Sequence, residues 1–357
     1  MQDKDKENKA NEILEKYIYS LLDKLNDTPP QSPAKKYHYV PRFYLESFSH
    51  PKTNMITVVD KLSGSYFEQT SDATGFEKDF YIVGERQKED WHVLAEIFWS
   101  LIESDVAPIY RKILQHKQIS LTERVVFSIF VCSMICRSRS AIRLMREMAG
   151  GLVDKVMKFV AEDEKRFKKM TGVLPGYSEN LSGSMRDDIL NDKVKAMGNQ
   201  NLSSPAAPSN TITLSPYILH MTWNVFKPSR QVVTSDTPAL TFSPQSLVLE
   251  GGKIGGVALK ESRVLFPLAP DSIFLAEWNK QDYQIAYSRL PERHTKNYNN
   301  IIVSAADRFV YLAFPHHDIL RFIENRRNRR IVHKMNCFKS IDGEITCSEQ
   351  FISNFKA

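Results

Sequence analysis

The longest apolar run of the chain, Val125 to Cys136, constrains the fold most. It is about six residues too short to cross a bilayer, so it predicts a helix buried in the core of a soluble protein. Helical spacing of apolar residues continues beyond it and predicts one helix over residues 121–149. A large core must surround this helix, and the hydrophobic fraction of 42% is sufficient to build one.

One arginine, Arg137, projects from the middle of the apolar face of that helix on a helical wheel. A guanidinium cannot lose its charge, so a buried one needs an anion beside it. The partner is either a protein carboxylate or the phosphate or carboxylate of a ligand, and Arg137 is a candidate ligand-binding residue. Arg139, Arg143 and Arg146 fall on the opposite side of the wheel, where we expect them in solvent.

Two glutamates on the preceding predicted helix, residues 87–115, offer such a partner. Glu96 and Glu103 are seven residues apart and lie along one border of its apolar stripe. At roughly 10 Å from each other, they need further ligands to hold one metal ion. Two arrangements are open: one glutamate pairs with Arg137 while the other faces a cleft, or both lie at the solvated edge of the helix. Glu103 is a candidate catalytic and metal-binding residue, and Glu96 a candidate ligand contact.

A strand end in the second half of the chain supplies another carboxylate. The buried strand Val232–Val233 is followed by Ser235 and Asp236, and Pro238 ends it. A sheet fixes such a carboxylate while the loop exposes it, which suits catalysis or metal binding. Asp236 is therefore a candidate catalytic and metal-binding residue, and Ser235 a candidate ligand contact. An ordinary turn before proline explains the same residues equally well.

An aromatic segment, KYHYVPRFYLESF at residues 36–48, follows a polar, proline-rich linker. Pro41 favours extended geometry before it, so His38 and Tyr39 should face opposite ways. Most of the segment is expected to anchor the chain in its core through large aromatic side chains. His38 is either a core residue or a general acid–base catalyst, and Arg42 is a candidate ligand contact.

The most basic stretch of the chain carries five arginines within residues 321–330. Its second half contacts nucleic-acid phosphates, or it complements the dipole at a helix end. The candidate nucleic-acid-binding residues are Arg326, Arg327, Arg329 and Arg330. The net charge of +6 permits a polyanionic partner without requiring one. Signatures of Walker-type, Rossmann, serine-hydrolase and zincin sites are missing from the sequence.

The order of the predicted elements indicates an α+β fold, with a helical N-terminal half packed against a mostly antiparallel sheet from the C-terminal third. An amphipathic helix over residues 6–26 belongs to an N-terminal part, 1–30, and packs on the body, on a second copy or on a partner protein. Residues 36–200 are mainly helical, with an N-terminal hairpin, and residues 211–357 are rich in sheet; we expect them to form one composite domain. A Ser/Pro/Ala-rich linker at residues 202–210 is the expected boundary between them.

The termini and cysteines add two further expectations. The first ten residues are polar and charged, which does not suit a signal peptide, so we expect a cytoplasmic protein. Near the other end, a two-residue turn at Asp342–Gly343 would pair Phe338 with Cys347 and leave Cys337 out of register by one. The four cysteines are best interpreted as free thiols.

The aromatic segment resembles the hallmark of a mainly microbial family of unknown function, His-Tyr-Val-Pro followed by an FYL..F pattern. The resemblance covers about residues 36–315, and many relatives have proline where this chain has Arg139. Weaker similarities are found at Ile102–Glu103, Arg137–Ser138 and Thr234–Ser235–Asp236. The resemblance implies no established chemistry, but it selects the same Arg137, Glu103 and Asp236.

These residues favour a nuclease-like hydrolase that acts on a phosphodiester or a nucleotide. Asp236 and Glu103 would hold a divalent metal ion, Mg or Mn, Arg137 would stabilise phosphate charge, and His38 would be the acid or base. A role in microbial antiviral defence is an expectation from such families and not from these residues. The alternatives are a non-catalytic sensor that binds an anion or nucleic acid, and an interaction protein that assembles through its N-terminal helix.

Overall fold

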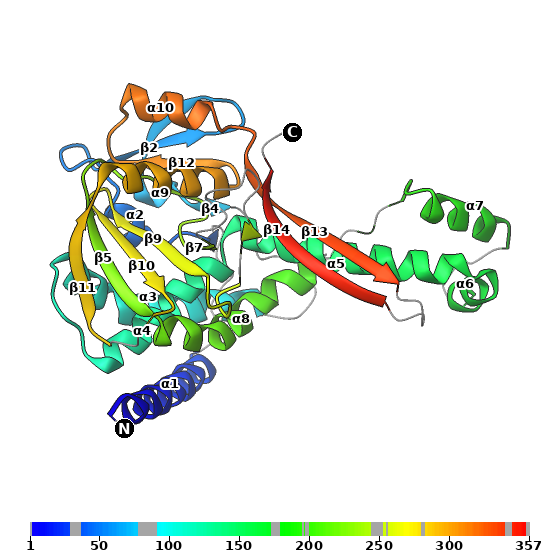
Figure 1. The fold of residues 1–357 in the computed structure, drawn as a ribbon, viewed down its shortest axis with the longest axis horizontal. Coiled ribbons are helices and arrows are strands. Elements are labelled where there is room, and N and C mark those ends of the chain that lie inside the picture. The colour runs from blue at the N-terminus through cyan, green and yellow to red at the C-terminus, as the bar shows by residue number, and fades with distance from the viewer. Residues whose placement is uncertain are drawn as a thin grey trace.

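The computed structural model of the protein describes residues 2–28, 37–77, 91–172, 179–194, 196, 200–243, 253–254, 256–279, 283–339 and 345–354. A main body carries the two larger sheets and most of the helices, and an arm projects from it (Figure 1). The arm consists of one long helix, two short ones beyond it, and a hairpin of two long strands that runs along the helix (Figure 1).

Helices dominate the first 220 residues. The long ones are α1 (Gln2–Asp27), α3 (Trp91–Leu114), α4 (Leu121–Cys136), α5 (Arg139–Glu162) and α8 (Gln200–His220), and the short ones are α2 (Arg42–Glu46), η1 (Ser71–Ala73), α6 (Glu164–Thr171) and α7 (Glu179–Leu190). Two more, α9 (Glu292–Ala305) and α10 (His317–Glu324), interrupt the strands of the C-terminal part. Helix α5 leaves the body and leads to α6 and α7 in the arm (Figure 1).

The strands form two main sheets and two small ones. One sheet has the order β11 (Ile285–Leu290), β5 (Thr222–Pro228), β10 (Ser272–Glu277), β9 (Arg263–Ala269) and β7 (Leu240–Phe242), and the other has β3 (Tyr66–Thr70), β2 (Met55–Asp60), β12 (Phe309–Leu312) and β6 (Thr234–Ser235). The small sheets are β1 (Tyr37–His38) with β4 (Phe76–Glu77), and β13 (Arg330–Lys339), β14 (Ile345–Asn354) and β8 (Lys253–Ile254). Among the described strands every pairing is antiparallel except that of β11 with β5, so the predicted α+β architecture is confirmed.

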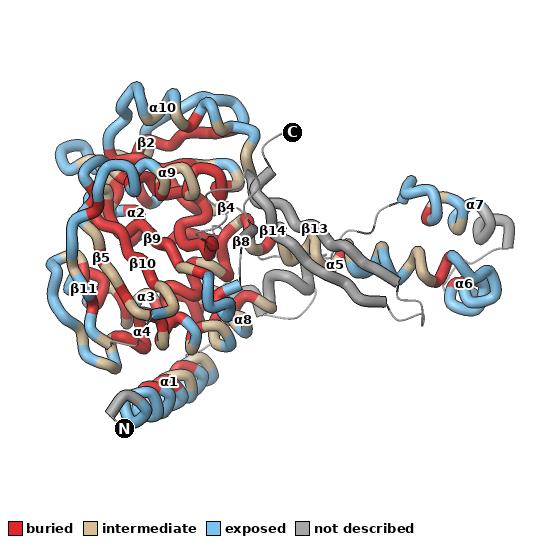
Figure 2. Tube along the Cα trace, in the orientation of Figure 1, coloured by how far each residue is buried: buried red, intermediate tan, exposed pale blue. Residues whose placement is uncertain are grey.

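The five-stranded sheet is covered on both faces, and this places two hydrophobic cores in the body. Alternate side chains of β9 point to opposite sides, with Phe266 in the core that includes α1, α3, α4 and α8. Its neighbour Leu265 contributes to the second core, together with residues of β12, α9 and α10. Figure 2 shows the buried residues concentrated between these layers.

Helix α4 is the central helix of the first core, as its apolar composition predicts. A capping box begins it: Ser120 Oγ accepts from the N–H of Glu123, and Glu123 Oε2 accepts from the N–H of Ser120. The helix ends at Arg137, because Ser138 caps a new helix by accepting from the N–H of Ala141 at 3.2 Å. The chain bends by 60° between α4 and α5. The prediction of one helix over residues 121–149 is therefore wrong.

The N-terminal helix α1 packs on the body of its own chain. Its apolar face buries Ala10, Leu14 and Leu21 in the first core, and Tyr17 Oη donates to Asp105 of α3 at 2.9 Å. This packing leaves Tyr19 exposed on the outer surface of the helix. Assembly with a second chain through α1 stays a prediction.

Within the described residues, no single helix combines the length and the apolar character that a membrane crossing needs. By length and composition alone, the bent pair of α4 and α5 passes the same test jointly. Almost the whole of α4 is buried inside the body.

The predicted linker at residues 202–210 is wrong, because these residues lie within α8. Packing outweighs the low helix propensity of the segment: Ala207 is fully buried in the core shared with α4, and Thr211 Oγ1 donates to its carbonyl at 2.9 Å. Helix α8 ends at His220, and Thr222–Pro228 forms β5.

The last hairpin of the chain has a different register from the predicted one. In the last hairpin Cys337 lies directly opposite Cys347, so the predicted register is wrong by one. Lys339 pairs with Ile345, so the number of residues between the two strands is odd. The predicted two-residue turn would need an even number.

Candidate functional site

A short extended segment carries His38 into the body. His38 pairs with Phe76 across β1 and β4, and the N–H groups of Tyr39 and Val40 both donate to the carbonyl of Gly75, at 3.0 and 3.1 Å. Gly75 has a φ of +71°, and a Cβ there would lie 2.9 Å from the Cβ of Val40. Glycine is therefore required for this close approach, which fixes the backbone on both sides of His38.

Arg137 is fully buried at the C-terminal end of α4. Its Nη1 donates to Oε1 of Glu103 on α3 at 2.7 Å, its Nη2 donates to the sulfur of Met134 at 3.5 Å, and its guanidinium lies 5.3 Å from the ring centre of Trp99. The sequence left open whether a protein carboxylate or a ligand anion pairs with Arg137, and in the structure the partner is the carboxylate of Glu103. The ion pair uses one edge of the guanidinium and joins α3 to α4.

Glu96 lies two helical turns before Glu103 on the same face of α3, near the same arginine. Burial raises the pKa of Glu96 to about 7; the charge of Arg137 opposes the rise and that of Glu103 adds to it. Of the two glutamates, Glu103 forms the ion pair with Arg137, and Glu96 interacts with the arginine through its charge.

His38 faces the same group of residues from β1. Burial lowers the pKa of His38, a hydrogen bond to the backbone of Asp72 raises it, and the charges of Glu103 and Arg137 also act on the ring. A backbone partner that raises the pKa of a histidine is a carbonyl, because the carbonyl favours the protonated nitrogen. Since Nε2 has no hydrogen-bond partner among the described residues, Nδ1 makes this bond and Nε2 keeps a free lone pair.

His38, Glu96, Trp99, Glu103 and Arg137 together form what we call the His38 cluster. Within the described part of the chain, four of its buried polar atoms have no hydrogen-bond partner: His38 Nε2, Glu96 Oε1, Trp99 Nε1 and Arg137 Nε. Buried polar atoms are normally paired, so four such atoms in one cluster are unusual for structural contacts alone. They provide a base, an acid and two N–H donors, which is the equipment of a proton-transfer site.

Asp236 does not belong to the His38 cluster. Its carboxylate is completely buried and accepts from the backbone N–H groups of Asp307, Arg308 and Phe309, at 2.8, 2.7 and 2.9 Å. Burial, reinforced by Asp307, raises the pKa of Asp236 to about 6, against the effect of these hydrogen bonds and of Arg139. The carboxylate holds the loop before β12, and this geometry does not favour the predicted catalytic and metal-binding roles.

Two predicted ligand contacts also make internal bonds. The buried Ser235 forms the turn that the sequence offered as an alternative: its Oγ donates to the carbonyl of Thr237 at 3.0 Å and accepts from the N–H of Thr237 at 3.1 Å. Arg42 is exposed and pairs with Glu46 at 2.9 Å and with Asp72 at 2.8 Å. Because the backbone of Asp72 holds His38, Arg42 supports the cluster from outside.

The expectation that Arg139 and Arg143 are solvated is wrong, because the bend after α4 redirects them. Both are largely buried and pair with Asp307, Arg143 Nε at 2.8 Å and Arg139 Nε at 3.6 Å. Arg139 also lies 5.8 Å from the ring centre of Tyr39, whose hydroxyl is 3.5 Å from that of Tyr311. Sequence reasoning missed this second polar group, and the serine after Arg137, a helix N-cap residue type, was the available signal.

The C-terminal arginines have different surroundings. Arg326 donates through Nε to Asn300 Oδ1 at 2.5 Å and stacks on Phe322, Arg327 is exposed, and the carbonyl of Arg329 accepts from Lys61 at 2.7 Å. The side chain of Arg330 lies outside the described residues. Nucleic-acid binding by these residues stays a prediction.

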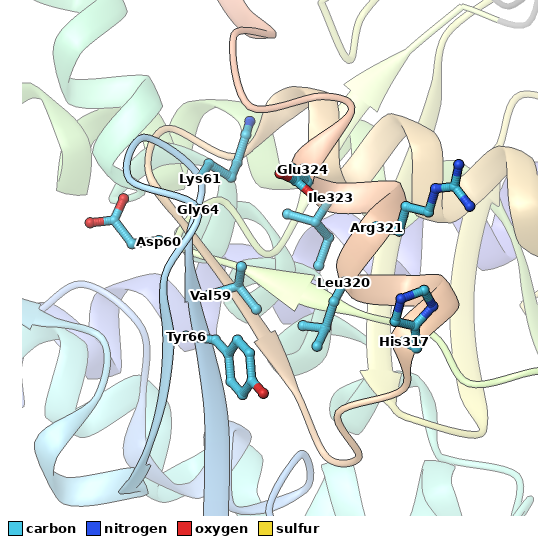
Figure 3. A pocket seen from close by; sticks show the side chains of 10 residues that line it. All are labelled: Val59, Asp60, Lys61, Gly64, Tyr66, His317, Leu320, Arg321, Ile323 and Glu324. Carbon is cyan, nitrogen blue, oxygen red and sulfur yellow. The ribbon is translucent and has the colours of Figure 1, made fainter.

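A pocket of about 440 Å³ lies between the β2–β3 hairpin and α10, away from the His38 cluster (Figure 3). Val59, Leu320 and Ile323 face its interior, whereas the side chain of Lys61 turns away (Figure 3). The buried ammonium of Lys61 donates to the carbonyls of Val303, Ala306 and Arg329, at 2.6, 2.8 and 2.7 Å. Lys61 therefore holds the end of α9 and is not a ligand contact.

Among the described residues, no group of three or more His, Cys, Asp or Glu side chains is arranged to hold a metal ion. Glu103 and Asp236, predicted to share one, belong to different polar groups. Metal binding by either residue stays a prediction.

The comparisons with known proteins agree with the extent of the resemblance. Residues 36–313 match the family described as "Protein of unknown function (DUF4238)". No curated protein and no solved structure matches the chain. The matched region includes the whole His38 cluster and most of both main sheets. The chain therefore belongs to the DUF4238 family.

Proposed function

We propose that the protein is a hydrolase that cleaves a phosphodiester or a nucleotide, and that its chemistry takes place at the His38 cluster. The accompanying cellular role is microbial antiviral defence, which rests on the family resemblance alone. One observation supports the hydrolase most: His38 Nε2 and Glu96 Oε1 are both buried, near one arginine, and unpartnered among the described residues. A cluster with only a structural purpose would pair these atoms.

His38 is suited to act as the general base. Its lowered pKa keeps the ring neutral at pH 7, and the bond from Nδ1 to Asp72 fixes the tautomer that leaves a lone pair on Nε2. This nitrogen can take a proton from an attacking water molecule. The carboxyl of Glu96, which interacts with the same arginine and has a pKa of about 7, can donate a proton to the leaving oxygen.

Arg137 supplies a positive charge that cannot be lost. Its ion pair with Glu103 holds the guanidinium in place, and Nε remains a free donor within the described part of the chain. A fixed donor of this kind stabilises negative charge that develops on a phosphoryl group. No step of this mechanism requires Asp236. Assays with Mg, with Mn and with EDTA decide whether the reaction needs a metal ion.

The test is a hydrolysis assay with single- and double-stranded DNA, RNA and mononucleotides. His38→Ala and Glu96→Gln should each reduce turnover by about 100-fold to 10,000-fold. The matched controls are His294→Ala and Glu46→Gln, two exposed residues outside the cluster, which should retain wild-type rates.

The pH profile separates the two roles. The rate should rise as His38 loses its proton below pH 6.5, and should fall above about pH 7 as Glu96 loses its own. His38→Ala should remove the acidic limb and Glu96→Gln the alkaline limb. The proposal is refuted if the wild type hydrolyses none of these substrates, or if both variants keep the wild-type rate. Binding without turnover would favour the non-catalytic sensor.

A further inference from the structure

A second pocket, of about 360 Å³, lies between α9, α10 and the loop before β6, and none of the His38 cluster lines it. Three cations from three segments meet there: Arg230 from the loop, Lys296 from α9 and Arg326 from the turn after α10. Figure 1 shows α9 and α10 at the end of the body opposite α1. The chain thus brings positive charges together at a cavity that the proposed catalysis does not use.

The walls of this pocket are held in place by an asparagine. Asn299 Oδ1 accepts from the N–H of Val233 at 3.1 Å, and its Nδ2 donates to the carbonyl of Gln231 at 3.0 Å. These two bonds join α9 to the loop that carries Arg230. The backbone that carries Arg230 and Lys296 on the two sides of the cavity is therefore held together by the fold.

The third cation is held by uncharged groups. Arg326 donates through Nε to Asn300 Oδ1 and through Nη1 to the carbonyl of Phe322 at 3.0 Å, and its guanidinium lies 3.7 Å from the ring centre of Phe322. Burial and the nearby Arg329 lower the pKa of Arg326, as expected where positive charge is concentrated. None of these contacts neutralises the guanidinium, which stays available to an anion.

The balance of charge in the pocket is positive. Glu292 pairs with both Arg230 and Lys296, at 2.9 and 2.8 Å, and Asp318 is an acidic residue of the lining. These two carboxylates do not offset the three cations that line the pocket. The pairs with Glu292 are exposed, so they contribute little and a ligand can replace them.

The remaining lining matches more than a bare anion. Gln231 and Asn297 line the pocket with carboxamides, which both donate and accept hydrogen bonds, and Ile319 and Phe322 add apolar surface. Gln231 Nε2 donates to the carbonyl of Phe314 at 3.3 Å, so this side chain is held in place within the lining. A volume of about 360 Å³ lies at the low end of ligand pockets, which range over roughly 300–1,000 Å³. We infer that this pocket binds a mononucleotide, with its phosphate at Arg230, Lys296 and Arg326 and its base at the carboxamides and the apolar surface.

The experiment is isothermal titration calorimetry of the full chain with AMP, GMP, CMP and UMP, and with inorganic phosphate. Lys296→Gln should weaken binding of the preferred nucleotide at least tenfold. This variant removes an exposed side chain whose described bond is an ion pair at the surface, so the fold should survive. Arg326→Gln should weaken binding by a similar factor. The matched control is Arg321→Gln on α10, which lines the pocket of Figure 3 instead and should bind as the wild type does.

Two further arms distinguish the alternatives. His38→Ala should bind the nucleotide as tightly as the wild type, because the two sites share no residue; failure of the proposed hydrolase therefore leaves this inference standing. Binding that falls with rising salt would agree with a phosphate held by cations. The inference is overturned if no nucleotide binds, if inorganic phosphate binds as tightly as nucleotides, or if Arg321→Gln weakens binding as much as Lys296→Gln.

Discussion

The carboxyl group of Glu96 should make the stability of the protein depend on pH, and Glu96→Gln tests this. Burial raises its pKa from 4.5 to about 7. The folded chain keeps a proton that the unfolded chain releases between these values, so the free energy of unfolding falls as pH rises through this window. Each pKa unit corresponds to about 1.4 kcal/mol, so the stability lost by about pH 8 is about 3 kcal/mol. The neutral glutamine avoids this loss.

The measurement is urea unfolding, followed by tryptophan fluorescence, at several values between about pH 4.5 and pH 8. Near the lower value Glu96→Gln should be about as stable as the wild type, and near the upper value it should be more stable by about 3 kcal/mol. Glu46→Gln, on the exposed side of α2, should differ from the wild type by a constant amount. A difference between Glu96→Gln and the wild type that does not change with pH would refute the reasoning.

Two further substitutions test the assignments of the other carboxylates. Glu103→Gln should destabilise the chain by about 3–5 kcal/mol, because it leaves the fully buried charge of Arg137 without its partner. Arg137→Met should cost less, because the carboxylate that it leaves unpaired, that of Glu103, is partly exposed. Urea unfolding of both variants gives the order, and the reverse order would contradict this reasoning. Asp236→Asn should cost about 3 kcal/mol in the same assay, because an amide cannot replace a carboxylate that accepts three backbone N–H bonds. If Asp236 is structural, the folded variant should keep its hydrolytic rate, and a rate loss beyond tenfold at unchanged folding would restore its catalytic role.

Periodicity in the sequence predicted the elements that bury continuous apolar faces. Helices α3 and α4 were predictable because their core positions recur at helical spacing. The same spacing made Glu96 and Glu103 candidate partners for Arg137. The pairing itself could not be predicted, because a protein carboxylate and a ligand phosphate satisfy a buried guanidinium equally well. Only the position of α3 against α4, a tertiary contact, decides between them.

Elements that depend on competition between local signals were not predictable in the same way. The apolar pattern across residues 121–149 suits one helix, but Ser138 also suits a helix N-cap, and the cap prevails. Asp236 was correctly placed at a strand end, yet its role depends on three N–H groups more than 70 residues later in the chain. In both cases the sequence contained the residue type, and the tertiary structure decided its use.

The bend after α4 explains how one short motif serves two polar groups. In the extended segment before Pro41, His38 faces Arg137 and Glu103, and Tyr39 faces Arg139 and Tyr311. An unbroken helix would carry Arg137 and Arg139 about 200° apart around one axis. Because the chain bends between them, Arg137 stays in the core beside α3, while Arg139 reaches Asp307 in the loop that Asp236 holds. The consecutive residues His38 and Tyr39 therefore face two arginines that lie on either side of the bend, Arg137 and Arg139. The His38 cluster is thereby joined to the sheet through covalent neighbours, which fixes the histidine where the proposed chemistry needs it.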